Sequence, residues 1–234
     1  MRPAYRLIFA APILLLSTCA MAATPCESLA KLSLPKTTIT MAVSVTPGAF
    51  KPPASFSLSL QPGDVAYKDL PAFCRIAATL KPTSDSAIKV EVWLPPLAEW
   101  NGKFMAVGNG AQGGQIVYPK MGLPLTLGYA VASTDTGHEG GPDDASFSVG
   151  HPEKQIDFAF RAVHEMVLKS KTIVAGYYDR SAKLSYWNSC STGGRQGLED
   201  VQRYPGDFDG VIAGAPAINP RSNVLRMWIA QAVH

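Results

Sequence analysis

The stretch that decides the fold is residues 186–197, which read Tyr186-Trp187-Asn188-Ser189-Cys190-Ser191-Thr192-Gly193-Gly194-Arg195-Gln196-Gly197. Residues 184–187 have the character of a short strand, and residues 193–204 that of a helix, so the small residues between them form a tight turn. A serine at the apex of a strand–turn–helix unit is the arrangement of a nucleophile elbow. A glycine-rich turn without catalysis is the alternative that the spacing alone leaves open.

The composition of the turn fits a serine nucleophile. Small residues two places before and after the serine allow close backbone approach, and here they are Ser189 and Gly193. The helix N-terminus favours negative charge, and the N–H of Thr192 can donate to an oxyanion. A phosphatase-like loop needs five residues between its cysteine and arginine. Only four separate Cys190 from Arg195, and the chain has no Gly-Lys-Ser/Thr sequence of a P-loop.

Outward from the turn, strands alternate with helices. Residues 104–107 predict a strand that runs into the glycine loop 108–114, and residues 129–133 and 211–213 predict two more. Residues 152–170 predict a helix, because Ile156, Phe160, Val163 and Val167 recur at helical spacing. Such alternation favours right-handed βαβ units and a mostly parallel sheet, which is an α/β fold.

The segment before residue 95 has a different character. Residues 73–80 and 87–94 predict a hairpin, with a half-buried second strand near a sheet edge, because Ile88 and Val90 alternate with Lys89 and Glu91. Residues 24–62 are rich in Thr, Ser and Pro and predict a loop-rich wrap.

The N-terminus predicts export. Arg2 and Arg6 precede an apolar run at residues 7–16, and Ala20-Met21-Ala22 forms a small-residue cleavage site, so residues 1–22 are predicted to be a secretory signal peptide. Two other interpretations are a buried core helix and a lipid anchor at Cys19. Removing residues 1–22 lowers the net charge from +3 to +1 and leaves no basic block, so we expect no nucleic-acid partner. We expect a secreted or periplasmic protein with no membrane association after cleavage.

An exported chain meets an oxidising compartment, where disulfides persist. Three cysteines remain after residue 22, and we predict that Cys26 pairs with Cys74, which would hold the N-terminal segment to the body. The alternative is that either of these cysteines is free and buried. In the predicted pairing, Cys190 is left over.

Several blocks, in order, make the chain similar to a known family. Residues 189–197, with Arg203-Tyr204-Pro205 and residues 208–217, resemble the tannase and feruloyl esterase family. Upstream, residues 100–104, 108–110 and 133–138 are similar to blocks of the same family. The resemblance runs from about residue 70 to the end of the chain, which makes it more specific than an isolated serine motif.

The resemblance implies an α/β-hydrolase that cleaves carboxylic esters of aromatic acids, such as feruloyl, galloyl or terephthalate-type esters. It places the nucleophile at Ser191. It places the backbone oxyanion donors at Thr192 and at Gly110 and Ala111, where many relatives have a second glycine at the Ala111 position. It also implies that Cys190 pairs with a cysteine beside the catalytic histidine.

The chain departs from the family after Ala217. There the family continues into an inserted lid, often with calcium, and then into strands that carry the catalytic acid and the histidine base. We therefore interpret residues 23–234 as the N-terminal part of the hydrolase domain, with the lid expected to begin near residue 217. On this chain itself we expect no metal site and no cofactor. The contrasting hypothesis is an inactive fragment or pseudoenzyme that at most binds ligands.

The residues present offer a poor substitute for the missing acid and base. His164 lies within a predicted helix, and His138 follows a strand end, where the family has a histidine that is not its base. Asp135 and Asp143 are interpreted as loop and capping residues. A triad built from the histidines of this chain is the less favoured alternative.

Overall fold

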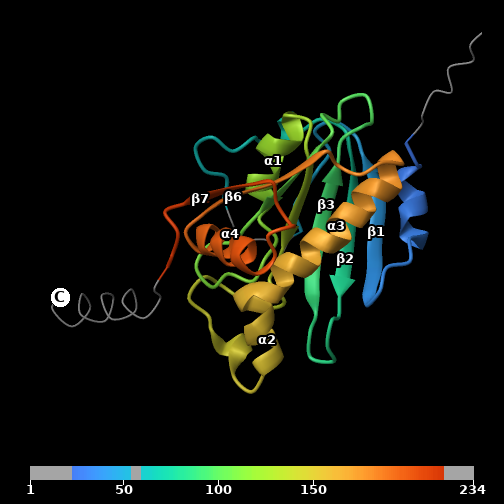
Figure 1. Ribbon diagram of the computed structural model, residues 1–234. Helices are drawn as coiled ribbons and strands as arrows, with labels where there is room; N and C mark the ends of the chain where they lie inside the picture. Colours follow the sequence, from blue (N-terminus) through green and yellow to red (C-terminus); the bar gives the residue numbers. More distant parts are fainter. Residues whose placement is uncertain (1–22, 54–58, 219–234) are drawn as a thin grey trace, which may run out of the picture.

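A computed structural model of the chain describes residues 23–53 and 59–218. The predicted signal peptide, with Cys19, and His234 lie outside these ranges. The described chain contains one seven-stranded sheet in the order β1-β2-β3-β5-β4-β6-β7 (Figure 1). The strands are β1 (Thr37–Val45), β2 (Phe73–Leu80), β3 (Ile88–Leu94), β4 (Lys103–Val107), β5 (Ala130–Thr134), β6 (Leu184–Cys190) and β7 (Gly210–Gly214).

The sheet joins an antiparallel half to a parallel half. The β1–β2, β2–β3 and β3–β5 pairs are antiparallel, whereas β5–β4, β4–β6 and β6–β7 are parallel. Each connection within the parallel half contains a helix, as parallel strands require. The predicted α/β class is therefore confirmed, and the carboxyl ends of β4, β5 and β6 meet at one edge of the sheet.

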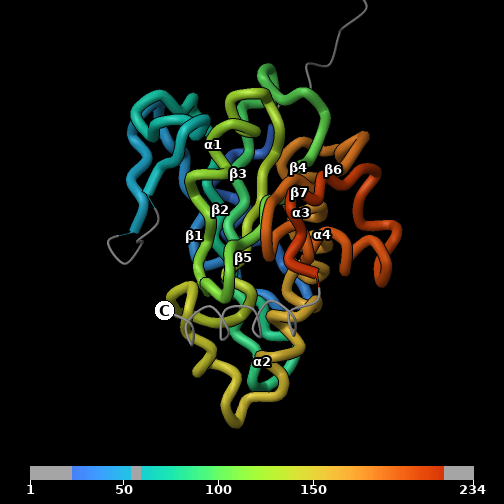
Figure 2. Tube along the Cα trace, turned by 90° about the vertical axis from the view of Figure 1, so that its left-hand side faces the viewer, coloured from blue at the N-terminus to red at the C-terminus, as the bar shows by residue number. Residues whose placement is uncertain are grey.

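Helices cover both faces of the sheet (Figures 1 and 2). The α-helices are α1 (Tyr118–Thr126), α2 (Pro152–Ile156), α3 (Ala162–Tyr178) and α4 (Thr192–Arg203), and short 3-10 helices span Cys26–Lys31, Tyr67–Asp69 and Ser146–Ser148. One core lies under α3 and α4 around Phe104 and Trp187. The second lies under α1 around Phe50 and Trp93. None of the described helices is long and apolar enough to cross a membrane.

The predicted hairpin is present, but its second strand does not lie near an edge. β3 is flanked by β2 and β5, and six of its seven residues are buried, Lys89 being the exposed one. The polar side chain of Glu91 is accommodated because Arg75 forms a bidentate ion pair with it and the Tyr118 hydroxyl donates to it at 2.8 Å. The predicted exposure to solvent therefore holds at Lys89, whereas at Glu91 the polar residue marks an internal ion pair.

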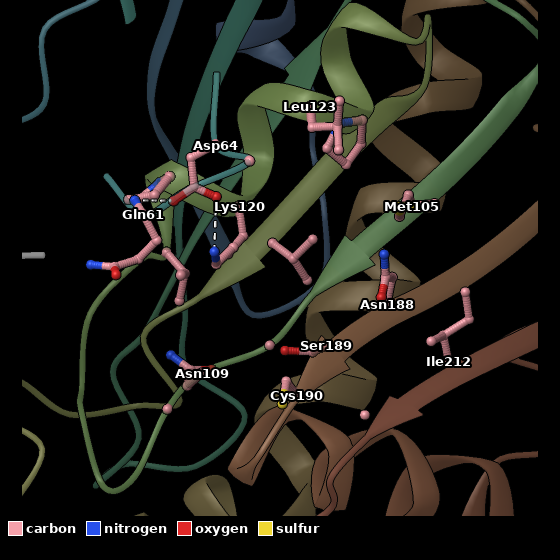
Figure 3. A pocket seen from close by; sticks show the side chains of 18 of the residues that line it. Gln61, Asp64, Met105, Asn109, Lys120, Leu123, Asn188, Ser189, Cys190 and Ile212 are labelled. Atoms are coloured by element: carbon pink, nitrogen blue, oxygen red, sulfur yellow. Dashed lines mark hydrogen bonds and ion pairs between the residues drawn. The ribbon is translucent and has the colours of Figure 1, made fainter. Parts of the chain in front are cut away.

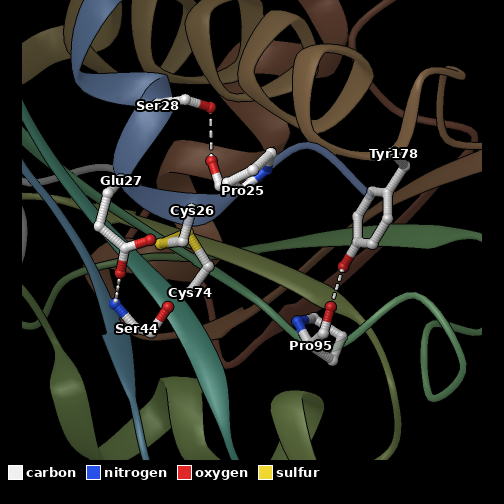
Figure 4. Close-up of a disulfide and its surroundings, with 8 residues drawn as sticks. All are labelled: Pro25, Cys26, Glu27, Ser28, Ser44, Cys74, Pro95 and Tyr178. Atoms are coloured by element: carbon white, nitrogen blue, oxygen red, sulfur yellow. Dashed lines mark hydrogen bonds between the residues drawn. A yellow bond between two sulfur atoms is a disulfide. The ribbon is translucent and has the colours of Figure 1, made fainter. Parts of the chain in front are cut away.

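The prediction of a loop-rich N-terminal wrap was wrong for residues 37–45. These residues form the edge strand β1, whose register shifts between Ile39 and Met41. The predicted disulfide between Cys26 and Cys74 is present and joins the first 3-10 helix to β2 (Figure 4). Nearby, the hydroxyl of Tyr178 at the end of α3 donates to the carbonyl of Pro95 at 2.7 Å.

The helix predicted at residues 152–170 extends to Tyr178 and is interrupted by a π-helical turn, Asp157–Arg161. Buried Ile173 and Val174 continue the apolar face beyond residue 170. The π-turn lies against α4, where Nη1 of Arg195 donates to the carbonyl of Ala159 at 3.1 Å. A π-turn widens a helix locally, and here it offers a backbone acceptor to the helix that carries the elbow.

Asp135, at the end of β5, is a loop residue, as the sequence indicated. Its Oδ1 accepts hydrogen bonds from the N–H groups of Lys89 and Gly137, both at 2.8 Å, and so extends the contact between β3 and β5. Its Oδ2 is buried without a partner in the described structure. Burial is the main reason that the pKa of Asp135 rises from 3.8 to about 7. Asp143 is exposed and caps no helix in the described structure, whereas the Oδ1 of the neighbouring Asp144 accepts from the N–H of Ser146 in the loop before the 3-10 helix Ser146–Ser148.

This burial predicts a pH-dependent effect of Asp135→Asn. The folded state binds the carboxyl proton more tightly than the unfolded state, so ionisation of Asp135 lowers the free energy of unfolding of the wild type as pH rises from about 4 to about 7. The variant keeps an Oδ1 acceptor and cannot ionise. Urea unfolding at several pH values should show that the free energy of unfolding of the variant, relative to that of the wild type, increases by up to about 4 kcal/mol across this range. Parallel pH profiles for the two proteins would contradict the assignment.

Candidate active site

Ser191 occupies a strained backbone conformation at the end of β6. Its φ is 59° and its ψ is −122°, a region that a residue with a Cβ rarely adopts, and its side chain is exposed. Three backbone hydrogen bonds hold it there. Its N–H donates to the carbonyl of Gly214, and its carbonyl accepts from the N–H groups of Arg195 and Ala217, at 2.9–3.1 Å. The predicted sharp turn is therefore present, directly before the N-terminus of α4.

The glycines around Ser191 are required by close contacts. A Cβ at Gly193 would lie 2.0 Å from the Oγ of Ser189, and one at Gly194 would lie 2.6 Å from the carbonyl oxygen of Gly214. The indole of the buried Trp187 fills the space beside Gly197, where a Cβ would lie 2.4 Å from it. Small residues are thus needed because the start of α4 packs closely against two side chains of β6 and against the backbone at the end of β7.

The glycine loop after β4 lies against the elbow. A Cβ at Gly108 would lie 2.4 Å from the Trp187 ring and 2.8 Å from the Cα of Gly193. In the described chain, the N–H groups of Gly110, Ala111 and Thr192 make no internal hydrogen bond. Ala111 has a φ of 48°, which explains why glycine is also suited to this position. The three predicted oxyanion donors therefore lie on two adjoining segments with their amides unused.

Two polar side chains hold the glycine loop in place. The Nδ2 of Asn109 donates to the carbonyls of Thr134 and Gln115, each at 2.9 Å. The Oε1 of Gln196 on α4 accepts from the N–H of Asn109 at 3.1 Å, so the loop and the elbow are joined directly. These positioning roles were not predicted from the sequence, although Asn109 and Gln196 both lie within the blocks that resemble the family.

His138 supports the same loop from the end of β5. Its Nε2 lies 2.8 Å from the carbonyl of Gln112, which only accepts, so Nε2 carries the hydrogen. Its ring stacks on Phe147 at 3.6 Å and also occupies the space beside Gly114. Burial lowers the pKa of His138, which favours the neutral ring. His138 thus positions the loop, in agreement with the expectation that it is not the base.

A cavity of about 760 Å³ adjoins the elbow on the face of the sheet that carries α1. Side chains from three neighbouring strands, Met105, Asn188 and Ile212, line one part of it, and Leu123 of α1 lines another (Figure 3). The glycine loop and Cys190 border the cavity, whereas Ser191 itself is not among its lining residues. The cavity therefore reaches the residue before the predicted nucleophile without enclosing the nucleophile.

Within the described ranges, no histidine lies in hydrogen-bond contact with Ser191. His138 bonds to the glycine loop, the Nδ1 of His151 contacts Asp85 at 2.8 Å, and the Nδ1 of His164 contacts Asp207 at 2.7 Å. A triad built from these three histidines is therefore not assembled in the structure. Cys190 is exposed and is the described cysteine without a disulfide partner.

The close packing of the elbow predicts that Gly193→Ala is strongly destabilising. The new methyl group would overlap Ser189, and overpacking of this kind costs about 1–3 kcal/mol of the free energy of unfolding. A suitable control is Gly141→Ala, because no atom lies within 4 Å of the Cβ that it adds. Urea unfolding should give a clearly lower midpoint for Gly193→Ala alone. Equal midpoints for the two variants would contradict the packing described.

Comparison with known proteins agrees with this geometry. A family model described as tannase and feruloyl esterase matches residues 74–234. An uncharacterized esterase of Xanthomonas campestris pv. campestris is 42% identical over 202 residues, which cover 86% of this chain and 33% of that protein. A probable feruloyl esterase B of Aspergillus clavatus is 42% identical over 146 residues, covering 62% of this chain and 27% of that protein.

Solved structures show the same relationship. Feruloyl esterase B from Aspergillus oryzae matches with a TM-score of 0.73 at 36% identity, covering 83% of this chain and 37% of that one. Tannin acyl hydrolase from Aspergillus niger matches with a TM-score of 0.59 at 24% identity, which shows the fold alone. The chain spans about a third or less of the length of the curated relatives named above. With its parallel half-sheet and its elbow at Ser191, this chain belongs to the tannase and feruloyl esterase family and has an α/β-hydrolase fold.

Proposed function

We propose that the protein is a serine hydrolase of carboxylic esters, with Ser191 as its nucleophile. The observation that carries this proposal is the exposed Ser191 at φ 59° and ψ −122°, between the end of β6 and the start of α4. A strained backbone at an exposed serine is costly and is characteristic of functional sites. The unused amides of Thr192, Gly110 and Ala111 beside it support a role in binding negative charge.

In the proposed reaction, the Oγ of Ser191 attacks the ester carbonyl carbon and loses its proton to a general base. The carbonyl oxygen becomes an oxyanion that accepts hydrogen bonds from the amides on both segments. Collapse of this intermediate releases the alcohol and leaves an acyl-enzyme, which water then hydrolyses to the acid. The α4 N-terminus contributes favourable electrostatics throughout, because its dipole is positive at this end.

We place the general base and the acid in the part of the relatives that this chain does not span. The three described histidines support this placement, since each bonds elsewhere. The same part would contribute the lid, any calcium that the lid holds, and the cysteine partner of Cys190. Serine hydrolases that lack triad members accelerate the reaction only about 10³–10⁴-fold over the rate in water, far less than the complete enzymes. Full activity therefore requires these segments.

For the substrate, we propose esters of aromatic acids. The apolar lining of the cavity, with Met105, Leu123 and Ile212, offers contact area for a ring, and the relatives are named for feruloyl esters and tannin. Feruloyl, galloyl and terephthalate-type esters share an aromatic acyl group, and we propose this class of ester without choosing among its members.

Ser191→Ala tests the proposed nucleophile. In protein expressed from the complete gene, it should lower kcat/KM for methyl ferulate, methyl gallate or a terephthalate monoester by at least about 10³-fold. Ser189→Ala is the matched control, because it removes a serine hydroxyl from the same strand, two residues before the strained position. Turnover that survives Ser191→Ala would rule out the proposed nucleophile. Absence of turnover in the wild type would favour the inactive-protein hypothesis.

We also propose that residues 1–22 direct export to the periplasm or the medium and are then removed. The disulfide between Cys26 and Cys74 supports this, because such bonds persist in oxidising compartments. Mass spectrometry of the exported protein should show an N-terminus at Ala23. A mature chain that begins at Cys19 would indicate a lipid anchor instead, and an intact N-terminus would contradict cleavage.

A further inference from the structure

A second cluster of chemically active side chains lies at the opposite end of α4 from Ser191. It consists of His164 on α3, Asp200 in the last turn of α4, and Asp207 in the loop between α4 and β7. Each residue contributes one nitrogen or oxygen atom, and all three atoms lie within 4.8 Å of one another. The closest pair is the Nδ1 of His164 and the Oδ2 of Asp207, at 2.7 Å.

Asp200 is the unexplained member of this cluster. It is 2% exposed, and neither of its carboxylate oxygens has a hydrogen-bond partner in the described structure. A buried carboxylate without a partner is expensive, and a native structure normally compensates for it with a hydrogen bond or a bound ion. Asp200 therefore has two free acceptor oxygens, and a ligand bound to them would offset the free-energy cost of removing this carboxylate from water.

The charge around Asp200 suits a cation. Asp207 is 5% exposed and lies beside Asp200, so two carboxylates share a site shielded from water. The ammonium group of Lys171 acts on Asp200 as a nearby positive charge, and its Nζ donates to the backbone carbonyls of Asp207 and Gly206, at 2.6 and 3.4 Å. The two carboxylates and this ammonium group together carry a net charge of −1, which a divalent ion reverses to +1.

We propose that His164, Asp200 and Asp207 form a structural site for a divalent transition-metal ion, Zn²⁺ in the first instance. One imidazole nitrogen with two carboxylate oxygens is a donor set that suits Zn²⁺, whereas Ca²⁺ and Mg²⁺ prefer oxygen alone. The fourth ligand would be water. It can approach past His164, whose side chain is 21% exposed, while both carboxylates are closed to solvent.

The geometry requires only a small adjustment. Ligand atoms about 2.0–2.1 Å from a tetrahedral Zn²⁺ lie roughly 3.3 Å apart, and the atoms here lie within 4.8 Å of one another, so the widest separation has to close by at most about 1.5 Å. The ring of His164 is already held by stacking on Tyr204 at 3.6 Å. The N–H of Asp207 donates to the carbonyl of Tyr204 at 2.9 Å, which fixes the loop that carries the second carboxylate. When the ion binds Nδ1, the hydrogen between His164 and Asp207 is lost from that nitrogen, and the neutral ring carries its hydrogen on Nε2.

An ion at this position would join three elements that carry the elbow. It would connect the C-terminal end of α4 to α3 and to the loop that leads into β7, the strand whose Gly214 accepts from Ser191. The role is structural, because the cluster lies at the far end of α4 from the nucleophile. The sequence led us to expect no metal site on this chain, and gaps of 35 and 6 residues between the three ligands match no metal-binding motif.

The test is a Zn²⁺ titration of tag-free protein expressed from the complete gene and stripped with EDTA, with Cys190 left in place because its proposed disulfide removes this thiol as a competing ligand. Calorimetry should give one ion per chain with a micromolar or tighter Kd, and Zn²⁺ should raise Tm. Asp200→Asn should weaken binding by at least about 10-fold. His151→Gln is the matched control, because the exposed pair of His151 and Asp85 has the same ring-to-carboxylate contact, at 2.8 Å, and it should bind Zn²⁺ as the parent does.

Two results would overturn the proposal. One is the absence of saturable binding to the parent protein up to about 100 μM Zn²⁺. The other is unchanged affinity in Asp200→Asn. If that variant does not fold, X-ray absorption of the Zn²⁺-loaded parent decides: a shell of oxygen atoms with a single imidazole supports the site, and a shell with two or more imidazoles refutes it.

Discussion

The left-handed backbone at Ser191 is the constraint on which the rest of the site depends. It is supported by the packing of Trp187, which lies four residues before Ser191. The indole Nε1 donates to the carbonyl of Gly193 at 2.9 Å, and the ring occupies the volume that side chains at Gly108 and Gly197 would need. This one buried aromatic residue thus requires a glycine both in the loop after β4 and in α4, and the strain at Ser191 is compensated by packing and hydrogen bonds around it.

The two segments that present free amides come from neighbouring strands. β4 carries the glycine loop and β6 carries the elbow, and these strands pair in parallel, so their carboxyl ends meet. Gln196 of α4 then fixes their separation through the N–H of Asn109. Preorganised donors of this kind are effective because they need not reorient as charge develops on a substrate. His138 at the end of β5 also bonds to the glycine loop, so three adjacent strands, β4, β5 and β6, together hold the donors in place.

Local patterns in the sequence were sufficient for the parallel half of the sheet and for the turn at Ser191. A strand–turn–helix unit is formed by residues that are close in sequence. The small residues Ser189 and Gly193 contact each other across this turn, so their small size is visible in the sequence as a local pattern. The environment of β3 was not predictable in this way, because Glu91 reads as solvent-facing until Arg75 and Tyr118 are placed beside it by tertiary structure. β1 was missed although Ile39, Met41 and Val43 alternate, since its Thr-rich composition was read as loop. The roles of Asn109, Gln196 and Asp200 depend on contacts between distant elements.

In the reaction that we propose, Ser191 and the amides of two segments act on the same substrate atoms. The decisive experiment is a crystal structure of the protein, expressed from its complete gene, after reaction with an aryl phosphonate ester. We expect a covalent bond from phosphorus to the Oγ of Ser191. We also expect the phosphoryl oxygen to lie about 2.7–3.1 Å from the amide nitrogen of Thr192 and from that of Gly110 or Ala111. An adduct on another residue, or a phosphoryl oxygen directed into solvent away from both segments, would contradict the proposed reaction.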